Sequence, residues 1–100
     1  MQHSDPLEAW VDESIVQSRR GGYNPTIFSS MRRGGTVAAM SKLVESGAIQ
    51  SGFIRLRDMG MLEWTVETGI LKFANRFTPQ AQACAQFRID HADDPMLRAG

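Results

Sequence analysis

The sequence predicts an all-α fold, a compact bundle of five to six short helices in a single domain. Three observations predict it. A chain of 100 residues has the usual size of one domain, apolar residues recur at helical spacing along it, and no segment alternates polar and apolar residues as a half-buried strand does. We expect one helical domain over residues 1–92 and a flexible C-terminal tail over residues 93–100.

The first two helices have matching start and stop signals. Asp5 followed by Pro6 is an N-cap residue followed by a first-turn proline. Arg19-Arg20-Gly21-Gly22 ends this helix, because arginine is favoured at the negative end of the helix dipole and glycine adopts a left-handed conformation beyond it. Asn24-Pro25 repeats the start, and Arg32-Arg33-Gly34-Gly35 repeats the stop after about two turns.

Four more helices are predicted from polar residues that can begin a helix and glycines that can end one. Thr36 caps a third helix that Gly47 ends, and a fourth runs from about Gln50 to Gly60. Thr65 caps a fifth, and Thr78-Pro79 opens a sixth that runs to about Asp90. The fifth helix is expected to bury one continuous face, formed by Val66, Ile70, Phe73, Ala74 and Phe77.

Charge is unevenly distributed along a chain whose net charge is zero. Residues 1–18 hold four acidic and no basic residues, residues 19–57 hold seven basic residues against one Glu, and residues 58–100 hold six acidic and four basic residues. The basic middle is typical of a surface for phosphate-rich partners. Alternatively, the acidic first helix folds back on the basic middle and neutralises it.

Residues 36–59 have helix-turn-helix proportions, with Gly47 opening the turn. In that arrangement Phe53 and Leu56 are buried, and the polar side of the second helix projects toward base edges. Leu43 departs from the motif, which usually has a small residue there, and Gly52 offsets this by allowing close contact. The alternative is an ordinary αα-hairpin with a solvated outer face.

The candidate nucleic-acid-binding residues combine this helix with the basic segment, since lysine and arginine neutralise phosphates and Gln and Arg pair with base edges. They are Arg19, Arg20, Arg32, Arg33, Lys42, Gln50, Ser51, Arg55 and Arg57.

The sequence contains no catalytic constellation. The two histidines, His3 and His91, lie near expected chain ends, and Cys84 lies among alanines, which favours core packing over a reactive thiolate. Glu63 and Glu67 are one helical turn apart, but without a third ligand we expect a solvated turn and no metal site. The glycine pairs match no phosphate-binding loop. We therefore expect no enzyme activity and no cofactor.

A single cysteine fits a reducing compartment. No apolar run approaches the length of about 18 residues that spans a bilayer, and the first ten residues lack the regions of a signal peptide. We expect a cytoplasmic protein with no membrane partner.

Residues 21–90 resemble a family of small all-helical bacterial proteins that has no established activity. The resemblance follows a G-Y-x-P-x-x-F, G-G, S-G-F-x-x-L and L-E-x-T-x-E pattern, carried by Tyr23, Pro25, Phe28, Gly34-Gly35, Leu43, Ser51-Gly52-Phe53, Leu56, Leu62-Glu63, Thr65 and Glu67. These positions are mostly glycine, aromatic or aliphatic, so the resemblance implies a shared core and carries over no site residues.

Two functional hypotheses follow from the sequence. The first is a non-enzymatic binding module that associates with nucleic acid through the basic segment and the helix-turn-helix-like hairpin. The second is a protein-interaction or inhibitor module of a bacterial or phage system, including a homodimer, because Trp10, Trp64 and six Met are many large apolar residues for short helices to bury.

Overall fold

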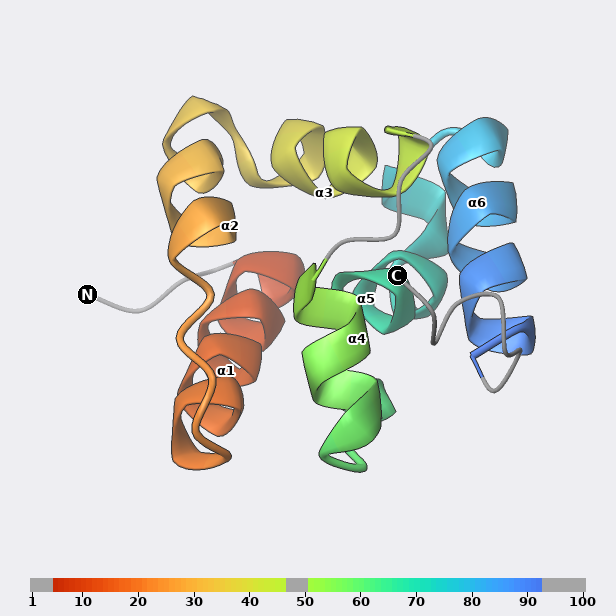
Figure 1. Ribbon diagram of the computed structural model, residues 1–100. Helices are drawn as coiled ribbons and strands as arrows, with labels where there is room; N and C mark the ends of the chain where they lie inside the picture. Colours follow the sequence, from red (N-terminus) through yellow and green to blue (C-terminus); the bar gives the residue numbers. More distant parts are fainter. Residues whose placement is uncertain (1–4, 47–50, 93–100) are drawn as a thin grey trace.

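The computed structural model describes residues 5–46 and 51–92, and within them the chain is all-α, as predicted (Figure 1). Its elements are α1 (Pro6–Arg20), α2 (Thr26–Met31), the 3-10 turn η1 (Arg32–Gly34), α3 (Thr36–Glu45), α4 (Ser51–Asp58), η2 (Leu62–Trp64), α5 (Val66–Lys72), η3 (Ala74–Arg76) and α6 (Pro79–Asp90). The expected stop at Gly47, the start near Gln50 and the tail over 93–100 lie outside the described residues. None of the helices in the described part is long and apolar enough to cross a bilayer.

Helix α5 lies at the centre of the bundle. It packs against α1, α3 and α6, and α4 joins this group through the turn η2 (Figure 1). The core between these helices is formed by Leu7, Val11, Phe28, Ala39, Met40, Val44, Ile70, Phe77, Ala81 and Ala85. Small alanines on α6 allow this helix to approach α5 closely, which fits the alanine-rich sequence of the segment.

Two helix stops were predicted correctly from glycine. Gly22 has φ of +102°, and beyond it the Tyr23 N–H donates to the Ser18 carbonyl at 2.9 Å. At the end of α4, Gly60 has φ of +72° and the Met61 N–H donates to Leu56 at 2.8 Å. Both ends have the hydrogen-bond pattern of a Schellman motif, which satisfies carbonyls that the helix leaves unpaired.

Three of the predicted helix starts are confirmed by their caps. The Asp5 carboxylate accepts a hydrogen bond from the Leu7 N–H, and the Thr65 and Thr78 hydroxyls accept from the third residue beyond each. Each cap satisfies a backbone donor that has no partner within the helix.

Two other predicted caps are wrong. The Asn24 amide oxygen accepts from Arg19 and caps nothing, so α2 begins at Thr26 without a side-chain cap. Gly35, with φ of +120°, is the N-cap of α3, and Thr36 is the first residue inside that helix. In both cases the polar side chain contacts a residue from another turn or helix, which local sequence does not reveal.

The predicted continuous face of the fifth helix is also wrong. Helix α5 ends at Lys72, because Phe73 leaves helical geometry with φ of −115° and ψ of 44°. The Gln82 side chain of α6 donates to the carbonyls of Ala74 and Phe77 and so stabilises the break. Ile70 and Phe77 still reach the core, one from the helix and the other from beyond the 3-10 turn.

Candidate functional site

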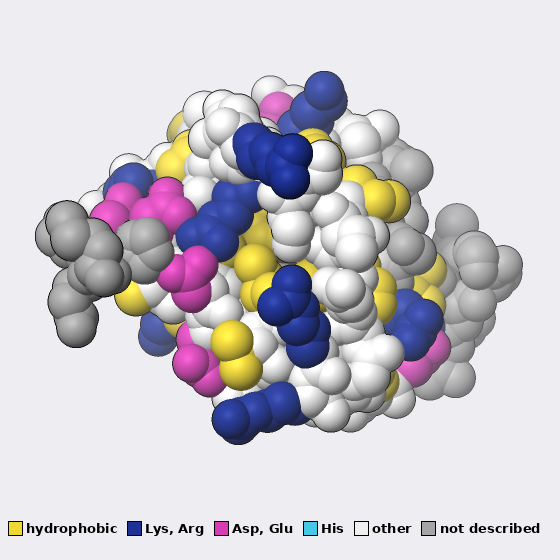
Figure 2. Space-filling model, turned by 90° about the vertical axis from the view of Figure 1, so that its left-hand side faces the viewer, with side chains coloured by type: hydrophobic (Ala, Val, Ile, Leu, Met, Phe, Trp, Pro, Cys, Tyr) yellow, Lys and Arg dark blue, Asp and Glu magenta, His cyan; other side chains and the backbone are white. Residues whose placement is uncertain are grey.

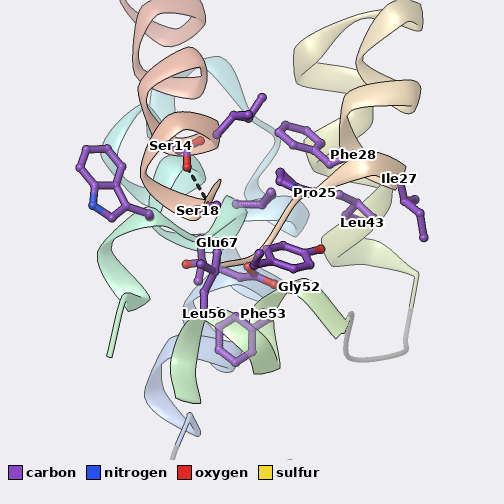
Figure 3. Close-up of a pocket in the computed structure, with 15 residues that line it drawn as sticks. Ser14, Ser18, Pro25, Ile27, Phe28, Leu43, Gly52, Phe53, Leu56 and Glu67 are labelled. Atoms are coloured by element: carbon purple, nitrogen blue, oxygen red, sulfur yellow. Dashed lines mark hydrogen bonds between the residues drawn. The ribbon is translucent and has the colours of Figure 1, made fainter. Parts of the chain in front are cut away.

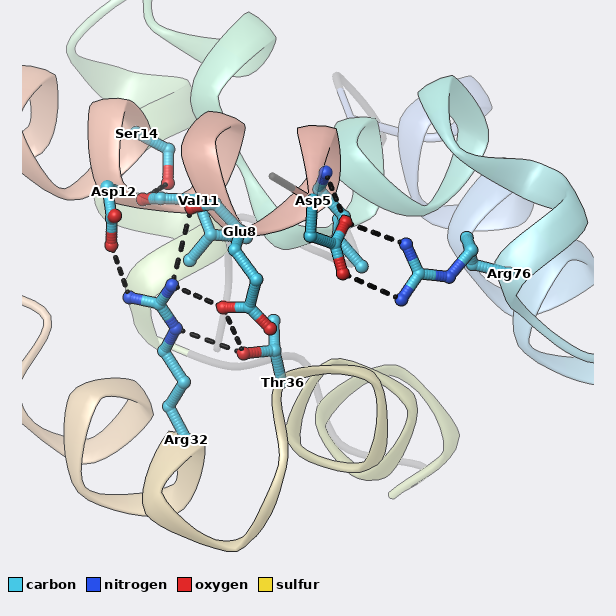
Figure 4. Close-up of polar contacts among 9 residues, drawn as sticks. Asp5, Glu8, Val11, Asp12, Ser14, Arg32, Thr36 and Arg76 are labelled. Atoms are coloured by element: carbon cyan, nitrogen blue, oxygen red, sulfur yellow. Dashed lines mark hydrogen bonds and ion pairs between the residues drawn. The ribbon is translucent and has the colours of Figure 1, made fainter. Parts of the chain in front are cut away.

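Arg32 is held against the acidic face of α1. Its Nη2 lies 2.6 Å from Glu8 Oε1 and its Nη1 lies 2.7 Å from Asp12 Oδ1 (Figure 4). Thr36 completes the cluster by donating to Glu8 and accepting from Arg32 Nε. Desolvation lowers the pKa of Arg32, but the hydrogen bonds that Arg32 donates to Glu8 and Asp12 outweigh this effect and raise the pKa above its ordinary value. At this residue the acidic first helix does neutralise the basic middle.

Arg57 is the second candidate whose charge is used inside the fold. Its side chain is only 8% exposed, Nη2 lies 2.9 Å from Asp58 Oδ1, and Nη1 donates to the Ala92 carbonyl at 3.2 Å. Arg57 therefore ties α4 to the residues that follow α6.

Five other predicted candidates are exposed: Arg19, Arg20, Arg33, Lys42 and Arg55. The Arg55 guanidinium carbon lies 5.4 Å from the centre of the Tyr23 ring, and Arg19 Nε donates to Asn24 Oδ1 at 3.3 Å. On the face in Figure 2, Lys and Arg side chains are separated by apolar and acidic ones. The fold therefore gathers Arg19 and Arg55 around the loop at Tyr23 and directs Arg32 to α1.

The predicted helix-turn-helix segment forms two helices, α3 and α4, and Phe53 and Leu56 are buried as expected. Gln50 lies outside the described residues, and only the backbone of Ser51 is described. Because residues 47–50 of the expected turn are also outside the description, base contact by this hairpin stays a prediction.

An apolar cleft of about 70 Å³ opens where α1, the α1–α2 loop, α2, α3, α4 and the start of α5 meet (Figure 3). Its apolar lining includes Pro25, Ile27, Phe28, Leu43, Phe53 and Trp64. Ile27 is 67% exposed. Ser14 and Ser18 also line the cleft, but their hydroxyls donate to carbonyls of their own helix, which leaves the lining less polar than the sequence suggests.

Tyr23 lies at the boundary between this cleft and the exposed arginines. A Cβ at Gly52 would lie 2.8 Å from the Tyr23 hydroxyl oxygen, so glycine at this position lets the phenol ring rest against α4. The sequence predicted that Gly52 allows the two helices of the hairpin to come close; the close contact that the structure has is instead with Tyr23 of the α1–α2 loop.

Glu63 is exposed, as expected of a solvated turn, but Glu67 lines the cleft from α5 and is 3% exposed, which contradicts the expectation for this residue. Its Oε2 accepts from Arg88 Nη1 at 3.0 Å, and the same nitrogen donates to the Leu43 carbonyl at 3.2 Å. Desolvation raises the pKa of Glu67 above its ordinary value, and the hydrogen bond from Arg88 opposes part of this rise. The burial of Arg88 could have been predicted from the sequence. Ala81, Ala85 and Arg88 have the i, i+4, i+7 spacing of one helix face, and this face of α6 is buried.

Of the histidines and the cysteine considered for catalysis, Cys84 lies on α6 and His91 directly follows this helix. His91 stacks on Phe87 with ring centres 4.1 Å apart, Cys84 is a half-buried free thiol packed against the core, and His3 is outside the described residues. Among the described residues, no three His, Cys, Asp or Glu side chains come together as metal ligands would.

The fold and cleft define a small all-α domain with an apolar recess beside exposed arginines. Comparisons of the chain with protein-family models, curated proteins and solved structures found no match.

Proposed function

We propose that the protein is a non-enzymatic binding module that takes a segment of a partner protein into the apolar cleft. The observation that carries this proposal is Ile27, a large aliphatic side chain that is 67% exposed and lines an apolar recess. An exposed apolar side chain next to a concave apolar surface is typical of a protein-interaction site. Association would remove both from water.

The charge distribution supports a protein partner over a phosphate backbone. Nucleic-acid affinity depends on cations that are available to neutralise phosphates, and Arg32 and Arg57 already form ion pairs with carboxylates of the same chain. A phosphate would gain nothing from the apolar lining of the cleft, because burying a charge without a partner is unfavourable.

Nucleic acid is the second candidate, favoured by one observation. Arg55 lies over Tyr23, and Arg19 and Arg20 are exposed on the turn just before it, so cations and an aromatic ring share one exposed region. Single-stranded nucleic acids are bound by such combinations. Filter binding at low salt tests this candidate: charge reversal at Arg19, Arg20 and Arg55 should abolish binding, and charge reversal at Arg33 should leave most of it.

Selection from a displayed peptide library tests the proposed function. We expect peptides that bind the full chain and lose at least tenfold in affinity when Ile27→Glu places a charge at the cleft. Val16→Glu is the matched control, because Val16 is also exposed, on α1, but does not line the cleft. The proposal is wrong if no peptide is selected, or if Ile27→Glu binds every selected peptide like the original protein.

A second copy of the chain is one protein partner that this design detects. If the cleft holds another copy, the mass in solution is that of a dimer, and Ile27→Glu converts it to a monomer.

A further inference from the structure

We infer that the partner segment is an acidic peptide with one branched aliphatic anchor, whose carboxylates are bound by Arg19 and Arg55 at the edge of the cleft. This inference rests on the proposed function and specifies the chemistry of the partner. Three observations carry it: the size of the cleft, the two arginines beside it, and the neutralised carboxylate in its lining.

The size of the cleft limits the anchor. Its volume is about 70 Å³, roughly half of the ~150 Å³ cavity that accommodates benzene in a protein core. We therefore expect a small aliphatic side chain to fill the cleft better than an aromatic ring, because packed walls resist the movement that a larger group needs. A Leu, Ile or Val side chain matches both the volume and the apolar lining.

The edge of the cleft carries positive charge that the fold does not neutralise. Arg55 lies over the ring of Tyr23, which lines the cleft, and Arg19 donates to Asn24, which lies in the chain between the lining residues Tyr23 and Pro25. Within the described part of the chain, neither guanidinium forms an ion pair, in contrast to Arg32, Arg57, Arg76 and Arg88. Carboxylates beside the anchor complement these two charges.

The residues that line the cleft disfavour a cationic anchor. Glu67 is the acidic residue that lines the cleft, and its Oε2 already accepts from Arg88 at 3.0 Å. A lysine or arginine anchor would compete with Arg88 for this carboxylate and would have to give up its hydration in an apolar recess. An uncharged aliphatic side chain leaves the Glu67–Arg88 pair intact.

A set of matched peptides tests the inference by fluorescence anisotropy. The probe is a short labelled peptide with a single Leu between Asp and Glu residues, and three variants replace the Leu by Ala, the Leu by Trp, or the acidic residues by Lys. We expect the acidic Leu peptide to bind the full chain and each variant to bind at least tenfold more weakly. Added salt should weaken the binding of the acidic Leu peptide, because the ion pairs that it forms with the protein are exposed to solvent.

Variants of the protein test whether Arg19 and Arg55 cause the preference for acidic peptides. Arg19→Gln combined with Arg55→Gln should lower affinity for the acidic peptide about tenfold and abolish the preference over the Lys peptide. Arg33→Gln is the control, because Arg33 is exposed but belongs to the polar recess beside Glu8 and Asp12. Thermal unfolding of each variant verifies that it folds.

Failure of the inference and failure of the proposed function look different. If Ile27→Glu blocks binding but acidic and Lys peptides bind equally, or the Trp peptide binds best, the inference is wrong and the cleft is still a protein-binding site. If no peptide binds, or Ile27→Glu has no effect, both are wrong. If an oligonucleotide binds through Arg19 and Arg55 and no peptide does, nucleic acid is the partner.

Discussion

At the scale of single residues, close packing around Gly69 determines how α5 meets its neighbours. A Cβ at this position would lie 2.5 Å from Trp10 Cζ3 and 2.9 Å from Met40 Cε. Trp10 is in turn packed on Trp64, with ring centres 5.7 Å apart, and Trp64 lines the cleft. Glycine at position 69 therefore lets α1 and α3 approach α5 and supports one wall of the cleft.

Gly69→Ala should lower the free energy of unfolding by about 1–3 kcal/mol, because overpacking displaces Trp10 and Met40. The loss is expected even though alanine is favoured over glycine inside a helix by about 1 kcal/mol. Urea unfolding measures it. Gly34→Ala is the control, since an added Cβ there has no heavy atom within 4 Å. A Gly69→Ala variant as stable as the original chain would show that the packing is looser than described.

The ion pair between Asp5 and Arg76 makes stability depend on pH. Two hydrogen bonds from Arg76, at 2.9 and 3.1 Å, are the main cause that lowers the pKa of Asp5 below its ordinary value of 3.8. A lowered pKa means that the stabilisation is present above the ordinary value and is lost as pH falls through the pKa of the folded state.

Asp5→Asn should therefore remove part of the acid dependence of stability. Asparagine is also a good N-cap residue, so the substitution removes the charge and retains the cap. Unfolding followed from neutral to acidic pH measures the effect, and Arg76→Gln should reproduce it. Identical pH profiles for the Asn variant and the original protein would contradict the assigned role of the pair.

At the scale of the elements, the buried pair of Glu67 and Arg88 joins three helices. It links α5 to α6, and through the Leu43 carbonyl it reaches the last turn of α3. Both side chains are at most 5% exposed, so removal of one leaves the other buried without this opposite charge. The pair thus fixes α5 relative to α3, and both of these helices contribute residues to the cleft.

Glu67→Ala or Arg88→Ala should each lower the free energy of unfolding by about 3–5 kcal/mol. Replacement of both by methionine should be much less destabilising, because two apolar side chains fill the same space without an unpaired charge. Chemical unfolding of the single and double variants measures this. The pair is not coupled as described if each single variant loses less than about 1 kcal/mol of unfolding free energy. The same holds if the double variant loses as much as the two single variants together.

Arg32 and Arg33 provide a matched comparison at the junction of α2 and α3. Arg32 faces Glu8 and Asp12 from a side chain that is 18% exposed, whereas its neighbour Arg33 is exposed. Arg32→Gln should lower the free energy of unfolding by about 1–2 kcal/mol. Arg33→Gln should change it by less than about 0.5 kcal/mol. If thermal unfolding shows that Arg32→Gln and Arg33→Gln change stability equally, the ion pairs of Arg32 do not stabilise the fold as described.

The elements were predictable to the extent that their ends are determined locally. Asp5, Thr65 and Thr78 cap helices because their partners are two or three residues away, and Gly22 and Gly60 end helices through their own backbone conformation. Thr36 was misassigned because its hydroxyl contacts Glu8, 28 residues earlier. When the partner of a polar side chain is distant in the sequence, the residues around that side chain do not indicate the contact.

At the scale of the whole molecule, the cleft could not be predicted because five helices and two connections contribute to it. The sequence predicts that Phe53 is buried and that Arg55 is exposed, both correctly. It does not indicate that Tyr23 lies beside both Gly52, 29 residues later, and Arg55, 32 residues later. That juxtaposition depends on how the α1–α2 loop packs against α4, which is a property of the assembled bundle.

The distribution of charge over the folded chain differs from its distribution along the sequence. Of the arginines in the basic middle, Arg32 and Arg57 face carboxylates, while Arg19 and Arg55 lie beside an apolar recess. A surface that combines apolar area with nearby positive charge is complementary to an acidic and aliphatic protein segment. This complementarity is the central claim about function.

Mapping of amide and indole chemical shifts by NMR during titration with the acidic Leu peptide tests that claim most directly. Binding in the cleft predicts the largest changes at Tyr23, Ile27, Leu43 and Phe53 and at the Trp64 indole, with little change at Arg33. Changes centred on Arg33 and Thr36, or none at peptide concentrations that saturate the anisotropy signal, would contradict it.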